Sequence, residues 1–283
     1  MNQQVLHTIT ESLGENIQGF SPLSGGDINE VFFLKTTTEN YVVKLNHANS
    51  FPKMFEAEAN GLQLLAKHSS FVIPEVINIG EVDNLAFLVM SYIPSGQKKV
   101  DFSKEFALRL AELHQTSQEN FGLAHNNYIG SLHQYNASAS NASEFYIQQR
   151  LQPQFELAAN NGFNFPQLEA FYERVSSLIP DEKPSLIHGD LWNGNHMVDM
   201  HGKPVLIDPA VAFAPREMDL AMMKLFGGYD TSVFEHYHTI FPLEKDWESR
   251  VELFQLYYLL VHLNLFGRSY LGAVESIIKK ISF

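Results

Sequence analysis

The sequence contains no cysteine among its 283 residues. Disulfide bonds, thiolate nucleophiles and zinc sites with cysteine ligands are therefore excluded. A long hydrophobic run is also lacking: the most apolar stretch, residues 253–266, is shorter than a membrane span and contains glutamine, histidine and asparagine. Residues 1–17 do not have the basic stretch and apolar run of a secretory signal. We therefore expect a soluble cytoplasmic protein with no membrane partner.

Positive charge is scarce: the chain has 19 Lys and Arg residues and 32 Asp and Glu residues, which gives a formal net charge of −13. Such a chain has little with which to neutralise a phosphate backbone, so no nucleic-acid partner is expected. A small phosphorylated ligand remains compatible, since it needs only a few local donors and a metal. The length and the 45% hydrophobic content allow one large domain or two lobes. We expect a monomer, although the sequence does not fix the number of subunits.

The first 94 residues predict a small lobe of strands with one helix. Runs of β-branched and aromatic residues predict strands, whereas apolar positions at helical spacing predict the helix. The strands are expected at 30–37, 40–46 and 86–94, the helix at 55–68, and a further short helix at 2–13.

The pattern becomes mainly helical after Pro94, and the polar stretch at 95–99 is the expected boundary. The predicted fold class is therefore α+β, with lobes at 1–94 and 95–283. Pro153 is expected to bend the helix that contains it. Helices are expected at 101–115, 143–159, 166–178, 216–226, 231–240, 246–266 and 270–281, and short strands near 186–189, 196–199 and 204–208.

An acid and an amide, Asp190 and Asn195, lie five residues apart after His188. This is the spacing of the H-R-D-x-x-x-x-N loop, in which Asp accepts the proton of the acceptor hydroxyl and Asn holds a metal. Asp208 follows an apolar strand, a suitable place for a carboxylate that joins the metal to phosphates. Each residue alone is equally typical of a turn, but the three together favour a phosphotransfer centre.

Lys44 lies in the second strand of the predicted hairpin, between Val43 and Leu45. A lysine on a half-buried strand can reach across a cleft to phosphates, and it needs an acid to orient it. Glu58 in the following helix is the first candidate and Glu56 the alternative. An exposed strand lysine and a solvated helix acid would explain the same pattern.

Three further features leave alternatives open. Gly25 and Gly26 could present backbone N–H groups to a phosphate, but an ordinary tight turn explains them almost as well. Trp192 is either a wall of the acceptor pocket or a lid on the core. Histidines near the loop lack the paired spacing of a zinc site, and His188 is expected to brace the loop.

Over nearly its whole length the chain resembles the fructosamine kinases, or ketosamine 3-kinases. This family belongs to the wider aminoglycoside phosphotransferase-like and protein-kinase-like fold. HGDLWNGN (188–195) is similar to the family's loop almost letter for letter. Residues 207–228 resemble the block that follows it, with DPA and then R-E-x-D. Further family segments are matched at 25–29, 54–65, 121–130 and 145–158.

The resemblance implies a two-lobed protein-kinase-like fold with ATP and Mg²⁺ in the cleft. Asp190 would be the catalytic base, and Asn195 and Asp208 the magnesium ligands. The nucleotide would be held by Lys44, Glu58, Gly25 and Gly26 and by the backbone of Met90, Ser91 and Tyr92. Trp192 and Glu217 would contact the acceptor.

The activity implied is transfer of the ATP γ-phosphate to the sugar 3-hydroxyl of a small or protein-bound ketosamine, of the fructosamine or ribulosamine type. The 3-phosphate is unstable and loses its sugar, so the implied role is deglycation repair. One alternative is a kinase of the same fold for an aminoglycoside or a choline-like amino alcohol. The other is a non-catalytic nucleotide-binding protein.

Overall fold

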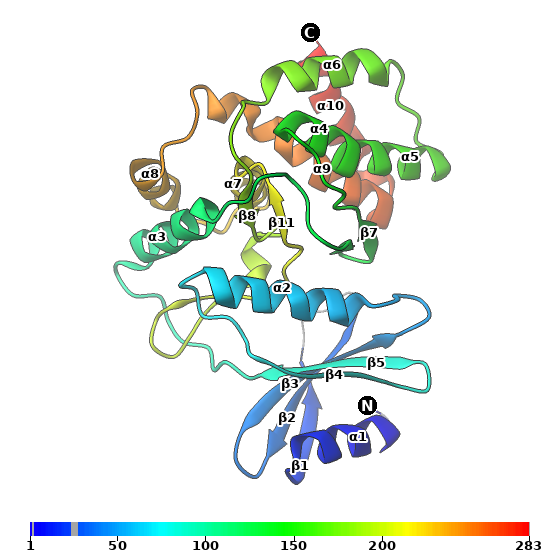
Figure 1. Cartoon of the computed structure of the whole chain (residues 1–283), viewed down its shortest axis with the longest axis vertical. Coiled ribbons are helices and arrows are strands. Elements are labelled where there is room, and N and C mark those ends of the chain that lie inside the picture. Colours follow the sequence, from blue (N-terminus) through cyan, green and yellow to red (C-terminus); the bar gives the residue numbers. More distant parts are fainter. Residues whose placement is uncertain (2, 24–27, 283) are drawn as a thin grey trace.

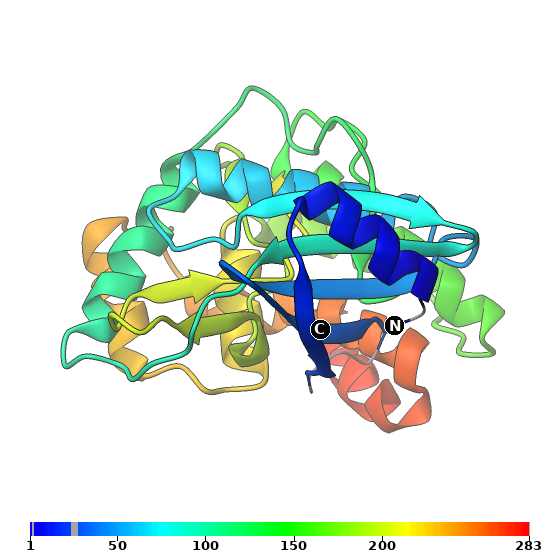
Figure 2. The same cartoon turned by 90° about the horizontal axis from the view of Figure 1, so that it is seen from below.

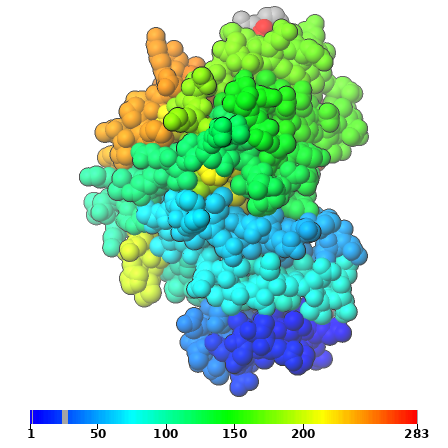
Figure 3. Space-filling view, viewed as in Figure 1, coloured from blue at the N-terminus to red at the C-terminus, as the bar shows by residue number. Residues whose placement is uncertain are grey.

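The computed structural model describes residues 1, 3–23 and 28–282. Figure 1 shows a sheet with α1 and α2 at one end of the molecule and a larger, mainly helical region at the other. We call these the sheet part (up to Ser91) and the helical part (from Phe102). The space-filling view shows the two parts stacked along the long axis, with α2 and its neighbours between them (Figure 3). The predicted α+β fold class is confirmed.

The sheet part is an antiparallel sheet in the order β1-β2-β3-β5-β4. Its three inner strands correspond to the predicted hairpin and buried strand, whereas the edge strands β1 and β4 were not expected. Edge strands have many exposed side chains, so their apolar pattern is weak. The bounds are β1 (Ile17–Pro22), β2 (Glu30–Thr36), β3 (Asn40–His47), β4 (Val76–Val82) and β5 (Leu85–Ser91).

Two helices cover opposite faces of this sheet: α1 (Gln3–Leu13) lies across the outer face, and α2 (Met54–His68) lies on the face toward the helical part (Figures 1 and 2). Side chains alternate along a strand, so neighbouring residues of β3 point to different faces. Val43 and Leu45 pack in the cluster that contains Ile9 of α1. Lys44 therefore points to the α2 side.

The helical part contains the helices predicted from the sequence, within a few residues at each end. Its centre is α9, which is buried around much of its circumference. The bounds are α3 (Phe102–Gln115), α4 (Ala142–Tyr146), α5 (Gln152–Asn160), α6 (Leu168–Leu178), α7 (Glu217–Leu225), α8 (Thr231–Ile240), α9 (Trp247–Phe266) and α10 (Leu271–Ser282).

Between α4 and α5 the chain forms a π-helical segment, Ile147–Leu151, just before Pro153. Proline has no N–H, so the carbonyl of Gln149 loses its usual partner four residues later. That carbonyl instead accepts a hydrogen bond from Nη1 of Arg150 at 2.9 Å. At the place where the sequence predicts a bend, the structure thus has a wider helical turn.

Short strands frame the loop that contains Asp190. β8 (Ser185–Ile187) pairs with β11 (Ala212–Ala214), and β9 (His196–Val198) pairs with β10 (Pro204–Leu206). A separate hairpin is made by β6 (Asn127–Ile129) and β7 (Leu132–Gln134). The predicted boundary after residue 94 falls in the connection between β5 and α3 and stays a prediction. Within the described ranges no helix has both the length and the apolar character needed to cross a membrane.

Candidate active site

The loop from His188 to Asn195 is held from below by Asp219 of α7. The two carboxylate oxygens of Asp219 accept hydrogen bonds from the backbone N–H groups of His188 and Gly189, each at 2.8 Å. Gly189 has φ of +84°, and a Cβ there would lie 2.0 Å from the carbonyl oxygen of Ala210. Only glycine fits this left-handed, closely packed position. The loop is therefore fixed at the residue before Asp190.

His188 braces the same loop, as expected. Its Nδ1 accepts from the N–H of Asp190 at 3.3 Å, so the proton is on Nε2, which donates to the carbonyl of Ile207 at 2.9 Å. Burial lowers the pKa of His188, which keeps this imidazole neutral. The brace joins the loop to the strand end that precedes Asp208.

Asp190 and Asn195 are in direct contact. Nδ2 of Asn195 donates to the backbone carbonyl of Asp190 at 2.8 Å and to its Oδ2 at 3.0 Å. Burial, together with the neighbouring Asp208 carboxylate, raises the pKa of Asp190 to about 7. A carboxyl group whose pKa lies near neutrality is suited to exchanging a proton with a hydroxyl group.

Lys44 connects the two parts of the molecule at this site. Its Nζ lies 2.6 Å from Oε1 of Glu58 and 2.6 Å from Oδ1 of Asp208. Burial opposes the charge of Lys44, but the two carboxylates outweigh it and raise its pKa, so the cation is retained. Of the two acids left open by the sequence, Glu58 is the partner; Glu56 is exposed and lies 4.0 Å from Lys53.

Asp208 has φ of +55°, a left-handed conformation that is uncommon for aspartate. Backbone strain of this kind costs about 1–3 kcal/mol and often occurs at functional sites. The surrounding contacts maintain it: Lys44 binds the side chain, and the neighbouring Ile207 donates its N–H to the carbonyl of Asn195 at 3.1 Å. The side chain is 39% exposed and faces a cleft.

The cleft between the two parts has a volume of about 720 Å³. The predicted residues Lys44, Glu58, Asp190, Asn195, Asp208 and Trp192 all line it. On the side of the sheet part, the cleft is also lined by Val31 of β2 and by Met54 and Ala57 of α2. The sequence-predicted catalytic, metal-binding and lysine-pair residues therefore come together around one cavity.

The donor set at the cleft suits a magnesium ion. Because Nδ2 of Asn195 is bound to Asp190, its carbonyl oxygen Oδ1 is left as an acceptor. Together with the partly exposed Asp208 carboxylate, it provides the hard oxygen ligands that Mg²⁺ prefers. No cluster of three or more His, Cys, Asp or Glu that would form a complete metal cage occurs in the part of the chain that the structure describes. This is consistent with a metal that arrives with phosphates.

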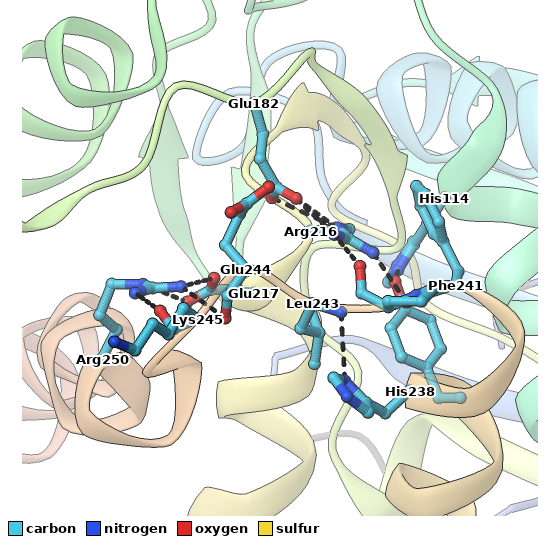
Figure 4. A network of polar contacts seen from close by, with 12 residues as sticks. His114, Glu182, Arg216, Glu217, His238, Phe241, Leu243, Glu244, Lys245 and Arg250 are labelled. Carbon is cyan, nitrogen blue, oxygen red and sulfur yellow. Dashed lines mark hydrogen bonds and ion pairs between the residues drawn. The ribbon is translucent and has the colours of Figure 1, made fainter.

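The structure gives no support to the predicted acceptor contact at Glu217. The side chain is buried and pairs with Arg250, with 2.9 Å between Oε2 and Nε, and Glu217 does not line the cleft (Figure 4). Its role is to join the start of α7 to α9. Asp219, two residues later, lies on another side of the helix and holds the Asp190 loop instead. The R-E-x-D run contained this signal, but the sequence did not reveal which acid faces the loop.

The adenine contacts predicted at the backbone of Met90, Ser91 and Tyr92 stay a prediction. The N–H of Ser91 donates to Glu75 at 2.9 Å, and that of Tyr92 donates to Asn40 at 3.1 Å. These two N–H groups are therefore already used within the protein, and none of the three residues lines the described cleft. Gly25 and Gly26 lie outside the described residues.

Tyr258 of α9 is a further residue that contacts the loop, and it was not singled out from the sequence. Its hydroxyl donates to the carbonyl of Gly189 at 3.0 Å, and the ring is buried. A tyrosine inside an apolar helix was a weak signal, since such residues are usually core.

Comparison with known proteins identifies relatives over the full length. The fructosamine kinase family model matches residues 1–282. A probable ketoamine kinase of Enterococcus faecium is 40% identical over 265 residues, covering 91% of this chain and 93% of that protein. A crystal structure from Haemophilus somnus, assigned to the fructosamine-3-kinases, superposes with a TM-score of 0.89 at 28% identity over 98% of this chain and 96% of that one.

More distant structures show the fold alone. An aminoglycoside phosphotransferase in complex with AMP-PNP and hygromycin B superposes with a TM-score of 0.61 at 17% identity, covering 98% of both chains. The predicted protein-kinase-like architecture is thus confirmed.

Proposed function

The chain belongs to the fructosamine kinase family, and on this basis we propose that it transfers the γ-phosphate of ATP to the sugar 3-hydroxyl of a ketosamine. The observation that carries the proposal is the convergence of Lys44, Glu58, Asp190, Asn195 and Asp208 on one cleft. A non-catalytic relative would be expected to lose at least one of these groups. The AMP-PNP complex of the distant aminoglycoside kinase supports ATP as the donor.

In the proposed reaction Asp190 orients the 3-hydroxyl and accepts its proton as the oxygen attacks the γ-phosphorus. The bond from the γ-phosphorus to the β,γ-bridging oxygen breaks, and ADP leaves. Lys44, held in place by Glu58, contacts the phosphates, and Asn195 and Asp208 would hold Mg²⁺. The bound metal would neutralise charge on the phosphates. The products are ADP and a ketosamine 3-phosphate, whose later loss of the sugar would make the reaction a deglycation step.

The alternative acceptors are aminoglycosides and choline-like amino alcohols. Aminoglycosides carry several ammonium groups, and a binding site normally pairs such clustered charge with carboxylates. Among the described residues that line the cleft, the only carboxylates are Glu58, Asp190 and Asp208, all of which belong to the phosphotransfer centre. This disfavours an aminoglycoside, and the assay below separates a ketosamine from a choline-like amino alcohol.

An ADP-release assay with purified protein tests the proposal. Ribulosamines and fructosamines, free and on a peptide, are compared with an aminoglycoside, choline and no acceptor. We expect turnover with ketosamines that requires Mg²⁺ and falls by about 10²–10⁴-fold in Asp190→Asn, the range for loss of a general base. Faster turnover of an aminoglycoside or of choline would replace the proposal with that alternative. ATP binding without turnover of any acceptor would favour the non-catalytic alternative.

A further inference from the structure

Five aromatic side chains form a wall on the acceptor side of the cleft. Trp192 comes from the catalytic loop, Phe226 from the end of α7, His262 and Phe266 from α9, and Tyr270 from the turn after it. All five line the cleft. We call this set the aromatic wall.

The rings of the wall are continuous. The centroids of Trp192 and Phe226 lie 6.4 Å apart, and those of Phe226 and His262 lie 4.9 Å apart. His262 then contacts Phe266 at 5.5 Å and Tyr270 at 5.1 Å. The wall therefore reaches from Trp192, two residues after Asp190, to Tyr270 in the turn after α9.

Much of this aromatic surface is open. Trp192 is 41% exposed, Phe226 42% and Phe266 53%, although large aromatic side chains are usually buried. Apolar rings that are exposed together and face a concave site are typical of a surface that binds an apolar group.

The wall carries no formal charge. Nδ1 of His262 lies 2.7 Å from the carbonyl of Tyr258, so this nitrogen carries the proton and Nε2 is left as an acceptor. Burial lowers the pKa of His262, which keeps its ring neutral at pH 7. The charged groups among the described lining residues are Lys44, Glu58, Asp190 and Asp208, all at the phosphotransfer centre.

Resting on the proposed function, we propose that the aromatic wall binds the aglycone of the ketosamine and selects substrates whose aglycone is a flat, uncharged ring. The amine nitrogen of a ketosamine is attached to C1, three bonds from the C3 that bears the accepting hydroxyl. With that hydroxyl at Asp190, the ammonium group comes close to Trp192, whose ring face attracts a cation. The aglycone beyond the nitrogen then meets Phe226 and Phe266.

The test compares three ketosamines built on one ketose from benzylamine, ethylamine and 1,4-diaminobutane. We expect kcat/KM for the benzyl compound to exceed that for the ethyl compound by about tenfold, since one aromatic contact plus its buried area supplies that factor. The diamine compound should be the poorest, because its second charge has no carboxylate on the wall.

Phe226→Ala and Phe266→Ala test the wall itself. Each should reduce the benzyl-to-ethyl ratio of kcat/KM by about fivefold, the effect of one lost ring contact. Phe20→Ala is the matched control: Phe20 is also 42% exposed, but it lies on β1 against Phe32 and does not line the cleft. This variant should keep the wild-type ratio. The ratio is informative because a merely structural defect would lower kcat/KM equally for both substrates and leave the ratio unchanged.

The failures of the two proposals are distinguishable. Turnover of all three ketosamines with a benzyl-to-ethyl ratio near one would overturn the aromatic wall and leave the proposed function intact. Equal losses of kcat/KM for the benzyl and ethyl compounds in Phe226→Ala and Phe266→Ala would also overturn the proposed role of the aromatic wall. Turnover of none of the three would overturn the proposed function.

Discussion

Lys44 is a buried cation held between Glu58 of α2 and Asp208 of the helical part. It reaches both because β3 turns Val43 and Leu45 into the opposite core. Loss of one partner from a buried ion pair leaves charge uncompensated, which typically costs about 3–5 kcal/mol. Here the second carboxylate remains, so the expected effect is on the position of the lysine.

The variant Glu58→Gln tests this arrangement. We expect kcat/KM for ATP to fall by about tenfold or more, because an orienting charge is lost while the shape is kept. Glu56→Gln is the matched control on the same helix, since Glu56 is exposed and distant from Lys44. Steady-state kinetics on both variants give the answer. Equal kcat/KM values for the two would contradict the pairing.

Asp190 should make stability depend on pH. Burial and the Asp208 carboxylate raise its pKa from the ordinary value of 3.8 to about 7. The folded state therefore holds the proton more tightly than the unfolded state. The stability that comes from keeping Asp190 protonated is fully present below the pKa of the unfolded state, and it is lost as the pH rises through 7.

Asp190→Asn removes the ionisation, so it should be more stable than wild type at pH 8 by about 1–3 kcal/mol, less than the full linkage value because the site is partly open. The difference should shrink to less than about 1 kcal/mol near pH 4, where the folded wild type is neutral at this position and the unfolded carboxyl is about half protonated. Urea unfolding at the two pH values measures it. A wild-type protein that is equally or more stable at pH 8 would contradict the raised pKa.

At the scale of residues, spacing predicted much of the candidate site. Asp190, Asn195 and Asp208 were found because a short loop and a strand end impose fixed distances along the chain. The contact predicted at Glu217 gained no support, because R-E-x-D does not reveal which acid faces the loop; Glu217 instead pairs with the buried Arg250, which is 33 residues away. Long-range partners of this kind leave no local pattern.

At the scale of elements, the π-helical segment presents Arg150 to a buried polar cluster. Nη2 of Arg150 donates to Oδ1 of Asn136 at 2.8 Å, and the guanidinium lies 4.6 Å from the ring centre of Phe145. Asn136 in turn donates to Asn127 of β6 at 2.9 Å. The cluster thus joins this helix to the hairpin whose tip lines the cleft.

Arg150→Ala should lower the free energy of unfolding by about 2–4 kcal/mol, because several buried acceptors lose their donor. Arg174→Ala is the control: Arg174 is exposed, and its Nη1 donates a long hydrogen bond of 3.4 Å to the hydroxyl of Ser177. That change should stay within about 0.5 kcal/mol of wild type. Denaturant unfolding of both variants is the measurement, and an unaffected Arg150→Ala protein would show that the cluster is not stabilising.

Elements differed in how far they could be predicted. Long amphipathic helices such as α3 and α8 carry several turns of periodic signal, and both were placed within one residue. The strands of β6, β7 and β11 are three residues each, too short for an alternating pattern. Their pairing depends on partners distant in sequence, such as β8 for β11.

At the scale of the whole molecule, the candidate site exists only where the sheet part meets the helical part. Lys44 and Asp208 are 164 residues apart, and nothing along the chain states that they touch. Both residues were expected near the phosphates, because phosphotransfer needs a cation and a metal-binding carboxylate there, but their direct contact was not predicted. A second link crosses the cleft at its side, where the hydroxyl of Tyr128 donates to the carbonyl of Pro52 at 2.9 Å.

The central claim is that this cleft transfers phosphate to one defined hydroxyl group. The most direct measurement is ³¹P and ¹H NMR of the product formed from ATP, Mg²⁺ and a ribulosamine, with wild type and Asp190→Asn run in parallel. The account predicts a phosphate monoester on the sugar C3 oxygen, formed in a one-to-one ratio with ADP by the wild type alone. Phosphate on another hydroxyl, release of inorganic phosphate only, or an equal yield from Asp190→Asn would contradict it.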